Sequence, residues 1–116
     1  MNIFGRQKTD EVGPVQVSDL QARGAVLLDV REDDEWTAGH APDAVHVPLA
    51  RIDEAASRFA SQPVLTVCRS GARSERAAKT LAAAGVDVHN VAGGMSAWAS
   101  AGLPVVRDDG SPGRVA

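Results

Sequence analysis

A chain of 116 residues with 44% hydrophobic content is long enough for one domain with its own apolar core. Its formal net charge of −3 argues against sequence-independent binding to nucleic acid, which requires a basic surface. A single cysteine excludes an internal disulfide, and no apolar stretch approaches the ~20 residues that a membrane span requires. We therefore expect a soluble, cytoplasmic protein with no nucleic-acid partner and no membrane partner.

The chain is expected to carry one ordered domain between two loose ends. Residues 1–12 are polar and irregular, which predicts a loose N-terminal leader, and the lack of a long apolar region there argues against a signal peptide. Residues 107–116 are rich in glycine, proline and charge, which predicts a disordered C-terminal tail. The domain is therefore expected to span residues 13–106.

Between these ends, expected strands alternate with expected helices. Apolar runs predict strands at residues 15–17, 25–30, 44–47, 64–67 and 86–91. Helical spacing of apolar residues, with glycines at helix ends, predicts helices at residues 19–23, 33–38, 52–60, 74–84 and 95–99. Strands that are joined through helices pair in parallel. The sequence therefore predicts an α/β fold of three layers, a central parallel sheet of about five strands with helices on both faces.

Cys68, the only cysteine, lies where the expected strand 64–67 passes into the next helix. A thiol at a helix N-terminus meets unpaired backbone N–H groups and the positive end of the helix dipole, which favour the thiolate. Arg69, Gly71 and Arg73 share the short loop, a combination that predicts a cradle for an anionic substrate. A buried structural cysteine is the alternative, since free cysteine is among the most buried residue types.

The length of this loop bears on the substrate. Four residues separate Cys68 from Arg73, whereas phosphatases of the cysteine class need one residue more to hold a tetrahedral phosphate. A tighter loop suits a sulfur atom attached to the cysteine. The spacing therefore favours sulfur transfer through a cysteine persulfide, and a cysteine phosphatase or an arsenate reductase is the weaker alternative.

Other polar and aromatic residues carry weaker signals. His40 is interpreted as a turn residue, and His46 and His89 as surface residues of strands, because a thiolate stabilised by loop amides needs no general base. One cysteine and three scattered histidines lack zinc-ligand spacing, so no metal and no cofactor is expected. Trp36 and Trp98 are expected to be packing residues.

Four motifs, in order along the chain, resemble the signatures of single-domain rhodaneses. They are residues 28–36 (Leu-Asp-Val-Arg-Glu, then Glu-Trp), residues 39–44 (Gly-His-Ala-Pro-Asp-Ala), the cysteine loop at residues 68–74, and residues 93–98 (Gly-Gly-Met-Ser-Ala-Trp). The resemblance covers about residues 13–105 and implies a rhodanese-like fold with sulfurtransferase activity. Ala41 and Asp43 stand where the family commonly has Ile and Gly, a departure in a turn and not at the nucleophile.

The resemblance also implies roles for individual residues. Cys68 would take a sulfane sulfur from thiosulfate or a persulfide and pass it to a thiophilic acceptor such as cyanide, a thiol or a protein. Backbone N–H groups of the loop would hold the transferred sulfur, and the loop arginines would attract the anion. The substrate-binding residues are then Arg69, Ser70, Gly71, Ala72 and Arg73. Asp29 and Arg31, at a neighbouring strand end, would brace the loop or line its rim and would not touch the reacting sulfur.

Two functions stay open on this resemblance. The first is a sulfurtransferase of the thiosulfate:cyanide type that acts on small anionic donors. The second is a sulfur carrier, which receives persulfide sulfur from a partner such as a cysteine desulfurase and delivers it to a sulfur-accepting protein, with little small-molecule turnover. An inactive copy of the fold is disfavoured by the intact Cys68 and both loop arginines.

Overall fold

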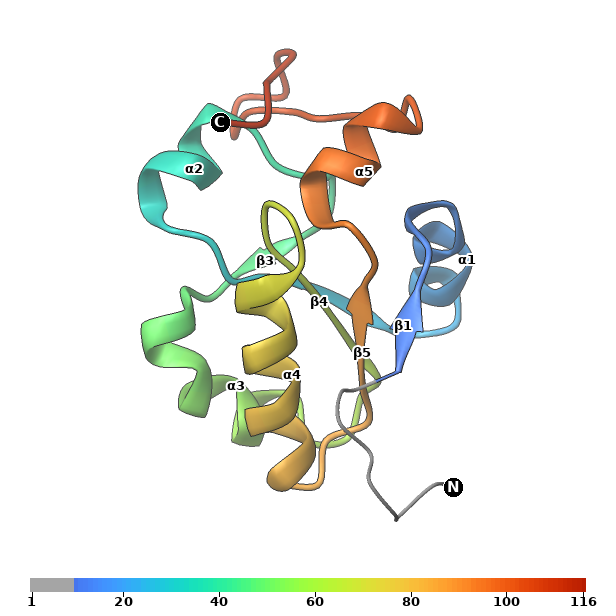
Figure 1. The fold of residues 1–116 in the computed structure, drawn as a ribbon, viewed down its shortest axis with the longest axis vertical. Helices are drawn as coiled ribbons and strands as arrows, with labels where there is room; N and C mark the ends of the chain where they lie inside the picture. Colours follow the sequence, from blue (N-terminus) through green and yellow to red (C-terminus); the bar gives the residue numbers. More distant parts are fainter. Residues whose placement is uncertain (1–9) are drawn as a thin grey trace.

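A central sheet of five strands runs through the protein (Figure 1). The computed structural model describes residues 10–116. The strands are β1 (Glu11–Val12), β2 (Val26–Asp29), β3 (Val45–His46), β4 (Val64–Val67) and β5 (Val88–Val91), and their order across the sheet is β1-β5-β4-β2-β3. Every neighbouring pair is parallel, which confirms the predicted α/β fold with a sheet of about five strands.

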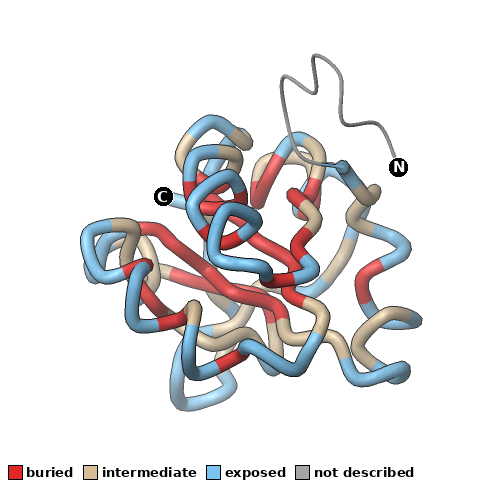
Figure 2. The backbone as a smooth tube through the Cα atoms, turned by 90° about the horizontal axis from the view of Figure 1, so that it is seen from below, coloured by how far each residue is buried: buried red, intermediate tan, exposed pale blue. Residues whose placement is uncertain are grey.

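Helices cover both faces of the sheet, as three layers require. They are η1 (Pro14–Gln16), α1 (Val17–Ala22), α2 (Asp33–Ala38), η2 (Leu49–Arg51), α3 (Ile52–Arg58), α4 (Ala72–Ala83) and α5 (Gly94–Ser100), where η denotes a 3₁₀ helix. Apolar residues of α3 and α4 pack on one face, and those of α1 and α5 pack on the other. Within the described residues, no helix is both long and apolar enough to cross a membrane. Figure 2 shows the buried strands between helices that are exposed on their outer sides.

Strand side chains alternate between two apolar cores. Leu28 of β2 and Val64 of β4 belong to the core shared with α3 and α4, whereas Leu27 and Leu65 belong to the core shared with α1 and α5. All four side chains are buried. Each such side chain stabilises the fold by about 1.5–3 kcal/mol relative to exposure. Because these strands are buried on both faces, their sequences are nearly continuous runs of apolar residues.

The strand order places the carboxyl ends of β2 and β4 side by side. Asp29 of β2 is in register with Val67 of β4. The chain moves outward from β2 to β3 and then returns across β2 to β4, so the direction of strand addition reverses there. In open parallel sheets a ligand crevice forms at such a reversal. Cys68 follows β4 directly and therefore lies at this edge of the sheet.

The N-terminal part of the domain differs from the expectation. Residues 15–17, predicted as a strand, belong to η1 and to the start of α1. Pro14 is the first residue of η1, where its fixed φ suits a helix start, and Gln16 Oε1 accepts a 2.6 Å hydrogen bond from the Gly13 N–H. The strand that completes the sheet is β1, which falls within the predicted leader. The rest of that leader, residues 1–9, lies outside the described residues.

Residues 107–116, predicted as a disordered tail, fold back on the domain. Just before this tail, His40 and Val106 exchange two 2.8 Å backbone hydrogen bonds. Within it, the Arg114 N–H donates to the Ala38 carbonyl oxygen at 3.0 Å, and Figure 1 shows the C-terminus beside α2. Composition alone misses these contacts, because the partners lie at the far end of α2 and not near the tail in sequence.

The approach of the tail to Gly39 allows a test of this arrangement. A Cβ at Gly39 would lie 2.6 Å from the backbone N and O of Arg114, while its extended backbone (φ 162°) accepts any residue. Gly39→Ala therefore acts by crowding alone, at about 1–3 kcal/mol, and we expect the tail to detach. Trypsin cleavage after Arg107 and Arg114, followed by mass spectrometry, should accelerate about fivefold or more.

Gly13→Ala is the control for this experiment. A Cβ at Gly13 would lie 3.5 Å from Gln16 Oε1, an ordinary van der Waals contact, and the backbone there has a φ of −78°. This variant should be cleaved after Arg107 and Arg114 at the wild-type rate. Equal cleavage of Gly39→Ala and the wild-type protein would show that the tail is not held against α2.

Candidate active site

The loop that carries Cys68 ends at a glycine with a left-handed backbone. Gly71 has a φ of 117° and is the N-cap of α4. L side chains rarely adopt this φ, so glycine is the residue that lets the loop turn into the helix. The helix starts at Ala72, earlier than the predicted start at residue 74, and Arg73 and Ser74 therefore lie in its first turn. The thiol thus faces the N-terminus of a 12-residue helix.

Cys68 Sγ is surrounded by hydrogen-bond donors. The Gly71 N–H donates to Sγ at 3.1 Å and the Ser74 hydroxyl donates to it at 3.3 Å. Cys68 is only 1% exposed. Burial by itself raises the pKa of this thiol, but hydrogen bonds from the Ser74 hydroxyl and from the backbone N–H groups of Ser74, Gly71 and Ser70 together lower the pKa below its ordinary value. Because the thiolate is the nucleophilic form, the loop prepares a buried nucleophile.

The first turn of α5 orients the loop from the other side. The Met95 N–H donates to the Cys68 carbonyl oxygen at 2.7 Å, and the Ser96 N–H donates to the Arg69 carbonyl oxygen at 2.9 Å. In a planar trans peptide the C=O and N–H point in opposite directions, so the N–H of each of these two peptide units turns away from α5 and toward the loop interior. Gly94 permits this close approach, since a Cβ there would lie 2.6 Å from the Arg69 carbonyl oxygen.

Arg73, predicted to bind substrate, is held by a carboxylate of α2. Its Nη1 and Nη2 donate to Glu35 Oε1 and Oε2 at 2.6 and 2.9 Å. The hydrogen bond from Arg73 lowers the pKa of Glu35 to about 2, against the opposing effect of burial, and the same contact raises the pKa of Arg73. The pair ties α2 to the first turn of α4 and keeps the guanidinium near the Cys68 sulfur.

Arg69, the other loop arginine, lies at the rim. Its side chain is exposed, and its Nε donates a 2.8 Å hydrogen bond to the carbonyl oxygen of Ala116 in the tail. A guanidinium carries two further nitrogens, which can meet an anion while Nε is occupied. Ser70 and Ala72 are exposed at the same rim. Substrate contact by these three residues stays a prediction.

Asp29 and Arg31 form a buried ion pair at the end of β2. Arg31 Nε and Nη2 donate to the Asp29 carboxylate, with a shortest distance of 2.7 Å, and both residues are fully buried. Arg31 Nη2 also donates to the Gly39 carbonyl oxygen at 2.8 Å. Among the described residues, Arg31 Nη1 is the buried side-chain nitrogen that has no hydrogen-bond partner. These contacts link β2 to the turn after α2, and a role of the pair in bracing the cysteine loop or lining its rim stays a prediction.

Sequence reasoning missed three contributors to the site: Ser74, Glu35 and Asn90. Ser74 is the last residue of the loop motif, and its place in the first helical turn was the available signal. Glu35 lies in an acidic run at a helix start, where solvated carboxylates are common. The sequence therefore gives no sign of its ion pair with Arg73. Asn90 lies in β5 beside the partly exposed His89, but it is itself a buried polar residue, only 1% exposed. A buried amide of this kind requires partners, and here they include the loop.

The histidines have structural partners away from the thiol. The rings of His40 and His46 stack on Trp36 with centroid distances of 3.6 and 4.8 Å. His40 Nε2 lies 2.9 Å from the Asp108 carboxylate, and His46 Nε2 lies 2.7 Å from the Arg31 carbonyl oxygen. His46 is therefore largely buried, which corrects its interpretation as a surface residue. In the described part of the chain, no three metal-ligating side chains lie together.

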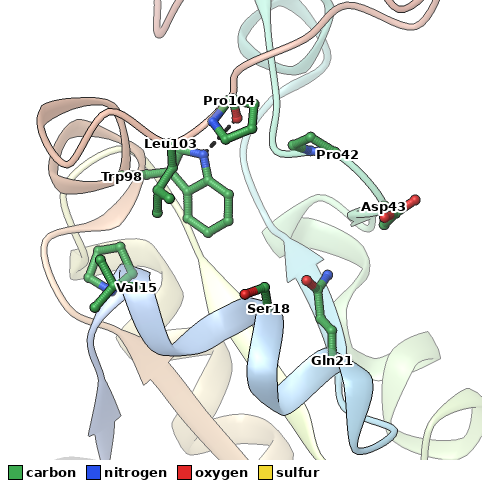
Figure 3. A pocket seen from close by; sticks show the side chains of 9 residues that line it. Val15, Ser18, Gln21, Pro42, Asp43, Trp98, Leu103 and Pro104 are labelled. Carbon is green, nitrogen blue, oxygen red and sulfur yellow. Dashed lines mark hydrogen bonds between the residues drawn. The ribbon is translucent and has the colours of Figure 1, made fainter.

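A separate hollow opens between α1 and α5 (Figure 3). It has a volume of about 210 Å³, and its walls include Val15, Leu103, Pro42 and the ring of Trp98. Trp98 is buried and its Nε1 donates a 2.7 Å hydrogen bond to the Pro104 carbonyl oxygen, which confirms the predicted packing role. Because the lining residues come from η1, α1, α5 and two turns, this hollow is distinct from the cysteine loop.

Comparison with known proteins relates the fold and the loop to one family. Residues 14–101 match the family described as Rhodanese-like domain. The thiosulfate sulfurtransferase GlpE of Pseudomonas savastanoi pv. phaseolicola is 37% identical over 89 residues, which cover 75% of this chain and 84% of GlpE. The putative sulfur carrier protein YrkF of Bacillus subtilis is 39% identical over 74 residues, which cover 62% of this chain and 40% of YrkF.

The likeness extends to solved structures. A rhodanese-related protein from Thermoplasma volcanium superimposes with a TM-score of 0.76 at 24% identity, over 84% of this chain and 97% of that chain. At this identity the likeness bears on the fold. Two curated relatives are longer than the matching part, since the chain spans 58% of one and 40% of the other. The fold is therefore shared closely, and the relatives' names cover both sulfur transfer and sulfur carriage.

Removal of the Ser74 hydroxyl tests the donors around the sulfur. Ser74→Ala takes away a hydrogen bond to Sγ of Cys68 and should raise the pKa of the thiol by about 1, because a hydrogen bond to a charged group contributes about 1.5–3 kcal/mol. The pH dependence of iodoacetamide alkylation measures this pKa. Ser57→Ala, at an exposed position in α3, is the control. A thiol pKa that is the same in all three proteins would contradict the assignment.

Removal of the Glu35 charge tests the pair with Arg73. Glu35→Gln should lower the free energy of unfolding at pH 7 by about 2 kcal/mol. A carboxylate with a depressed pKa stabilises the folded state above its unfolded pKa, and this stability is lost as the pH falls through the folded pKa. The difference from the wild-type protein should therefore shrink between about pH 4.5 and pH 2. Urea unfolding across this pH range measures the free energy of unfolding of the variant and of the wild-type protein. Glu54→Gln, at an exposed position, is the control. A difference independent of pH would count against the ion pair.

Proposed function

Because the chain belongs to the rhodanese family, we propose that it is a sulfurtransferase that works through a persulfide on Cys68. The donor is thiosulfate or another persulfide, and the acceptor is a thiophile such as cyanide, a thiol or a protein. The observation that carries the proposal is the set of donors on the buried sulfur, from Gly71 and Ser74. We place the protein in the reducing cytoplasm, where a lone thiol stays reduced.

In the first step, the Cys68 thiolate attacks the outer sulfur of thiosulfate. A new S–S bond forms between Sγ and that sulfur, the S–S bond of thiosulfate breaks, and sulfite leaves with the bonding electron pair. The attacking sulfur starts as the thiolate, so the step requires no general base. The N–H groups of the loop then face the persulfide and stabilise the negative charge on its outer sulfur.

In the second step, the acceptor attacks the outer sulfur of the persulfide. The bond between Sγ and the outer sulfur breaks, and its electron pair returns to Cys68 as the thiolate. Cyanide leaves as thiocyanate, and a thiolate acceptor leaves as a persulfide. The two steps together restore the starting enzyme and consume no external oxidant or reductant. The same donors that stabilise the thiolate therefore make Cys68 a good leaving group.

The contact between Arg73 and Glu35 favours a second candidate function, that of a sulfur carrier. Thiosulfate carries two negative charges, and a free arginine beside the nucleophile would help to bind it. Here both terminal nitrogens of Arg73 donate to Glu35. A donor that brings less charge, such as a protein-bound persulfide from a desulfurase, depends less on this arginine. The name of YrkF as a putative sulfur carrier agrees with such a role.

Mass spectrometry of Cys68 tests the proposal. After incubation with thiosulfate, glutathione persulfide, or a cysteine desulfurase with cysteine, the wild-type protein should gain the mass of one sulfur atom. Cys68→Ser should gain none, and thiocyanate or persulfide formation should fall to the uncatalysed background, because a serine oxygen cannot carry the sulfur. His89→Ala, which keeps every residue of the loop, should behave as the wild-type protein does.

The donor panel separates the two candidate functions. Rapid labelling by thiosulfate, followed by turnover with cyanide, would support the small-molecule enzyme. Labelling by the desulfurase, with negligible thiosulfate turnover, would support the carrier. Absence of a Cys68 adduct with every donor would overturn both.

A further inference from the structure

Asn90 is a buried amide on β5 that faces the cysteine loop. Its Nδ2 lies 3.3 Å from the Gly71 carbonyl oxygen and 3.5 Å from Glu11 Oε2 of β1, and its Oδ1 lies 3.5 Å from the Thr66 hydroxyl of β4. The side chain is 1% exposed. Burial of an amide is costly unless its groups are paired, so these contacts have to offset that cost. None of the four motifs of the sequence includes Asn90.

The Gly71 carbonyl oxygen competes with the sulfur for one proton. Ser74 Oγ lies 3.2 Å from this oxygen and 3.3 Å from Cys68 Sγ, and a hydroxyl has a single hydrogen to donate. A carbonyl oxygen accepts through two lone pairs, and the Glu75 N–H occupies one of them at 3.0 Å. Asn90 Nδ2 occupies the other. With both lone pairs engaged, the hydroxyl is left for the sulfur.

We propose that Asn90 is a positioning residue of this site: its amide saturates the Gly71 carbonyl oxygen and thereby directs the Ser74 hydroxyl to Cys68 Sγ. Asn90 acts through Ser74 and not by contact with the sulfur. The meaning of this arrangement for catalysis rests on the proposed function. The choice of the Ser74 hydroxyl between the Gly71 carbonyl oxygen and Cys68 Sγ requires no sulfur donor and can be measured without one.

The neighbours of Asn90 set the orientation of its amide. The Gly71 carbonyl oxygen can only accept a hydrogen bond, so the amide atom that faces it must be Nδ2. The Thr66 hydroxyl donates its one hydrogen to the Ser74 carbonyl oxygen at 3.0 Å, and its oxygen lies 3.5 Å from Oδ1 of Asn90. Strand β4, strand β5 and the first turn of α4 are therefore joined by one buried polar network. The network fixes both the amide and the backbone of Ser74.

The test is a double-mutant cycle in the full chain, read out by the pKa of the Cys68 thiol from the pH dependence of iodoacetamide alkylation. Asn90→Ala should raise this pKa by about 0.5–1, which slows alkylation below the pKa about three- to tenfold. Added to Ser74→Ala, the same substitution should have no further effect, because the hydroxyl that it directs is gone. Arg73 and Glu11, the charged groups near the thiol and the amide, are present in every variant.

A second variant guards against a simple loss of folding. Asn90→Leu keeps the number and branching of the side-chain heavy atoms but cannot donate, and it should raise the thiol pKa as Asn90→Ala does. His89→Ala is the matched control, since its side chain on the same strand contacts Asp87 and is 30% exposed. The control should leave the thiol pKa unchanged.

The outcomes separate this inference from the proposed function. A thiol pKa that Asn90→Ala and Asn90→Leu leave unchanged would overturn the inference. If Asn90→Ala raised the thiol pKa equally in the presence and in the absence of the Ser74 hydroxyl, the inference would be overturned as well, since Asn90 would then act by another route. A thiol pKa that follows the cycle, in a protein that accepts no sulfur from any donor, would support the inference and overturn only the proposed function.

Discussion

Burial of the Cys68 sulfur among hydrogen-bond donors is the constraint on which the rest of this structure depends. Cys68 is almost fully removed from solvent, and a buried charge is unfavourable unless hydrogen bonds replace its water. Backbone N–H groups suit this task because the path of the chain already orders them, whereas a flexible side chain loses rotamer entropy when it is fixed. The loop supplies such groups, and Ser74 adds one hydroxyl whose direction is controlled by its neighbours.

Long-range contacts hold the loop in this shape. Amides of α5 take the carbonyl oxygens of Cys68 and Arg69, so the N–H groups of the same peptide units are left for the interior. This approach is close enough that only glycine fits at residue 94, which gives the Gly-Gly pair of the C-terminal motif a physical role. Glu35 fixes the first turn of α4 from α2. The surroundings of Cys68 are therefore set by α4, which follows it in the chain, and by α2 and α5, which are distant in sequence.

This division between local and distant contacts explains how much could be predicted. The parallel sheet and the position of Cys68 follow from apolar runs and from one strand-to-helix junction, which are local patterns. Composition carries no signal for contacts with residues far away in sequence. These contacts set the partner of Arg73, the half-buried place of His46 and the fold of the tail. The prediction of a strand at residues 15–17 was wrong, because a short apolar run fits a strand or a helix start equally well.

One departure from the family pattern turns out to be conservative for the backbone. Asp43 stands where glycine is common, and it is the residue other than glycine with a positive φ, 63°, in the described part of the chain. Aspartate tolerates this left-handed region better than most residues, so the turn keeps its path while it gains a charge. The change is confined to the wall of the hollow beside α1, which Asp43 lines, and it leaves the cysteine loop as it is.

The balance of charge at the loop bears on the choice of donor. Glu35 offsets the charge of Arg73 at 2.6 Å, whereas Arg69 is exposed at the rim of the loop. The N-terminus of α4 adds roughly half a positive charge next to Cys68. A dianion such as thiosulfate gains more from an unpaired arginine than a singly charged persulfide group does. The contact with Glu35 therefore leaves Arg73 with less positive charge to offer to a dianionic donor.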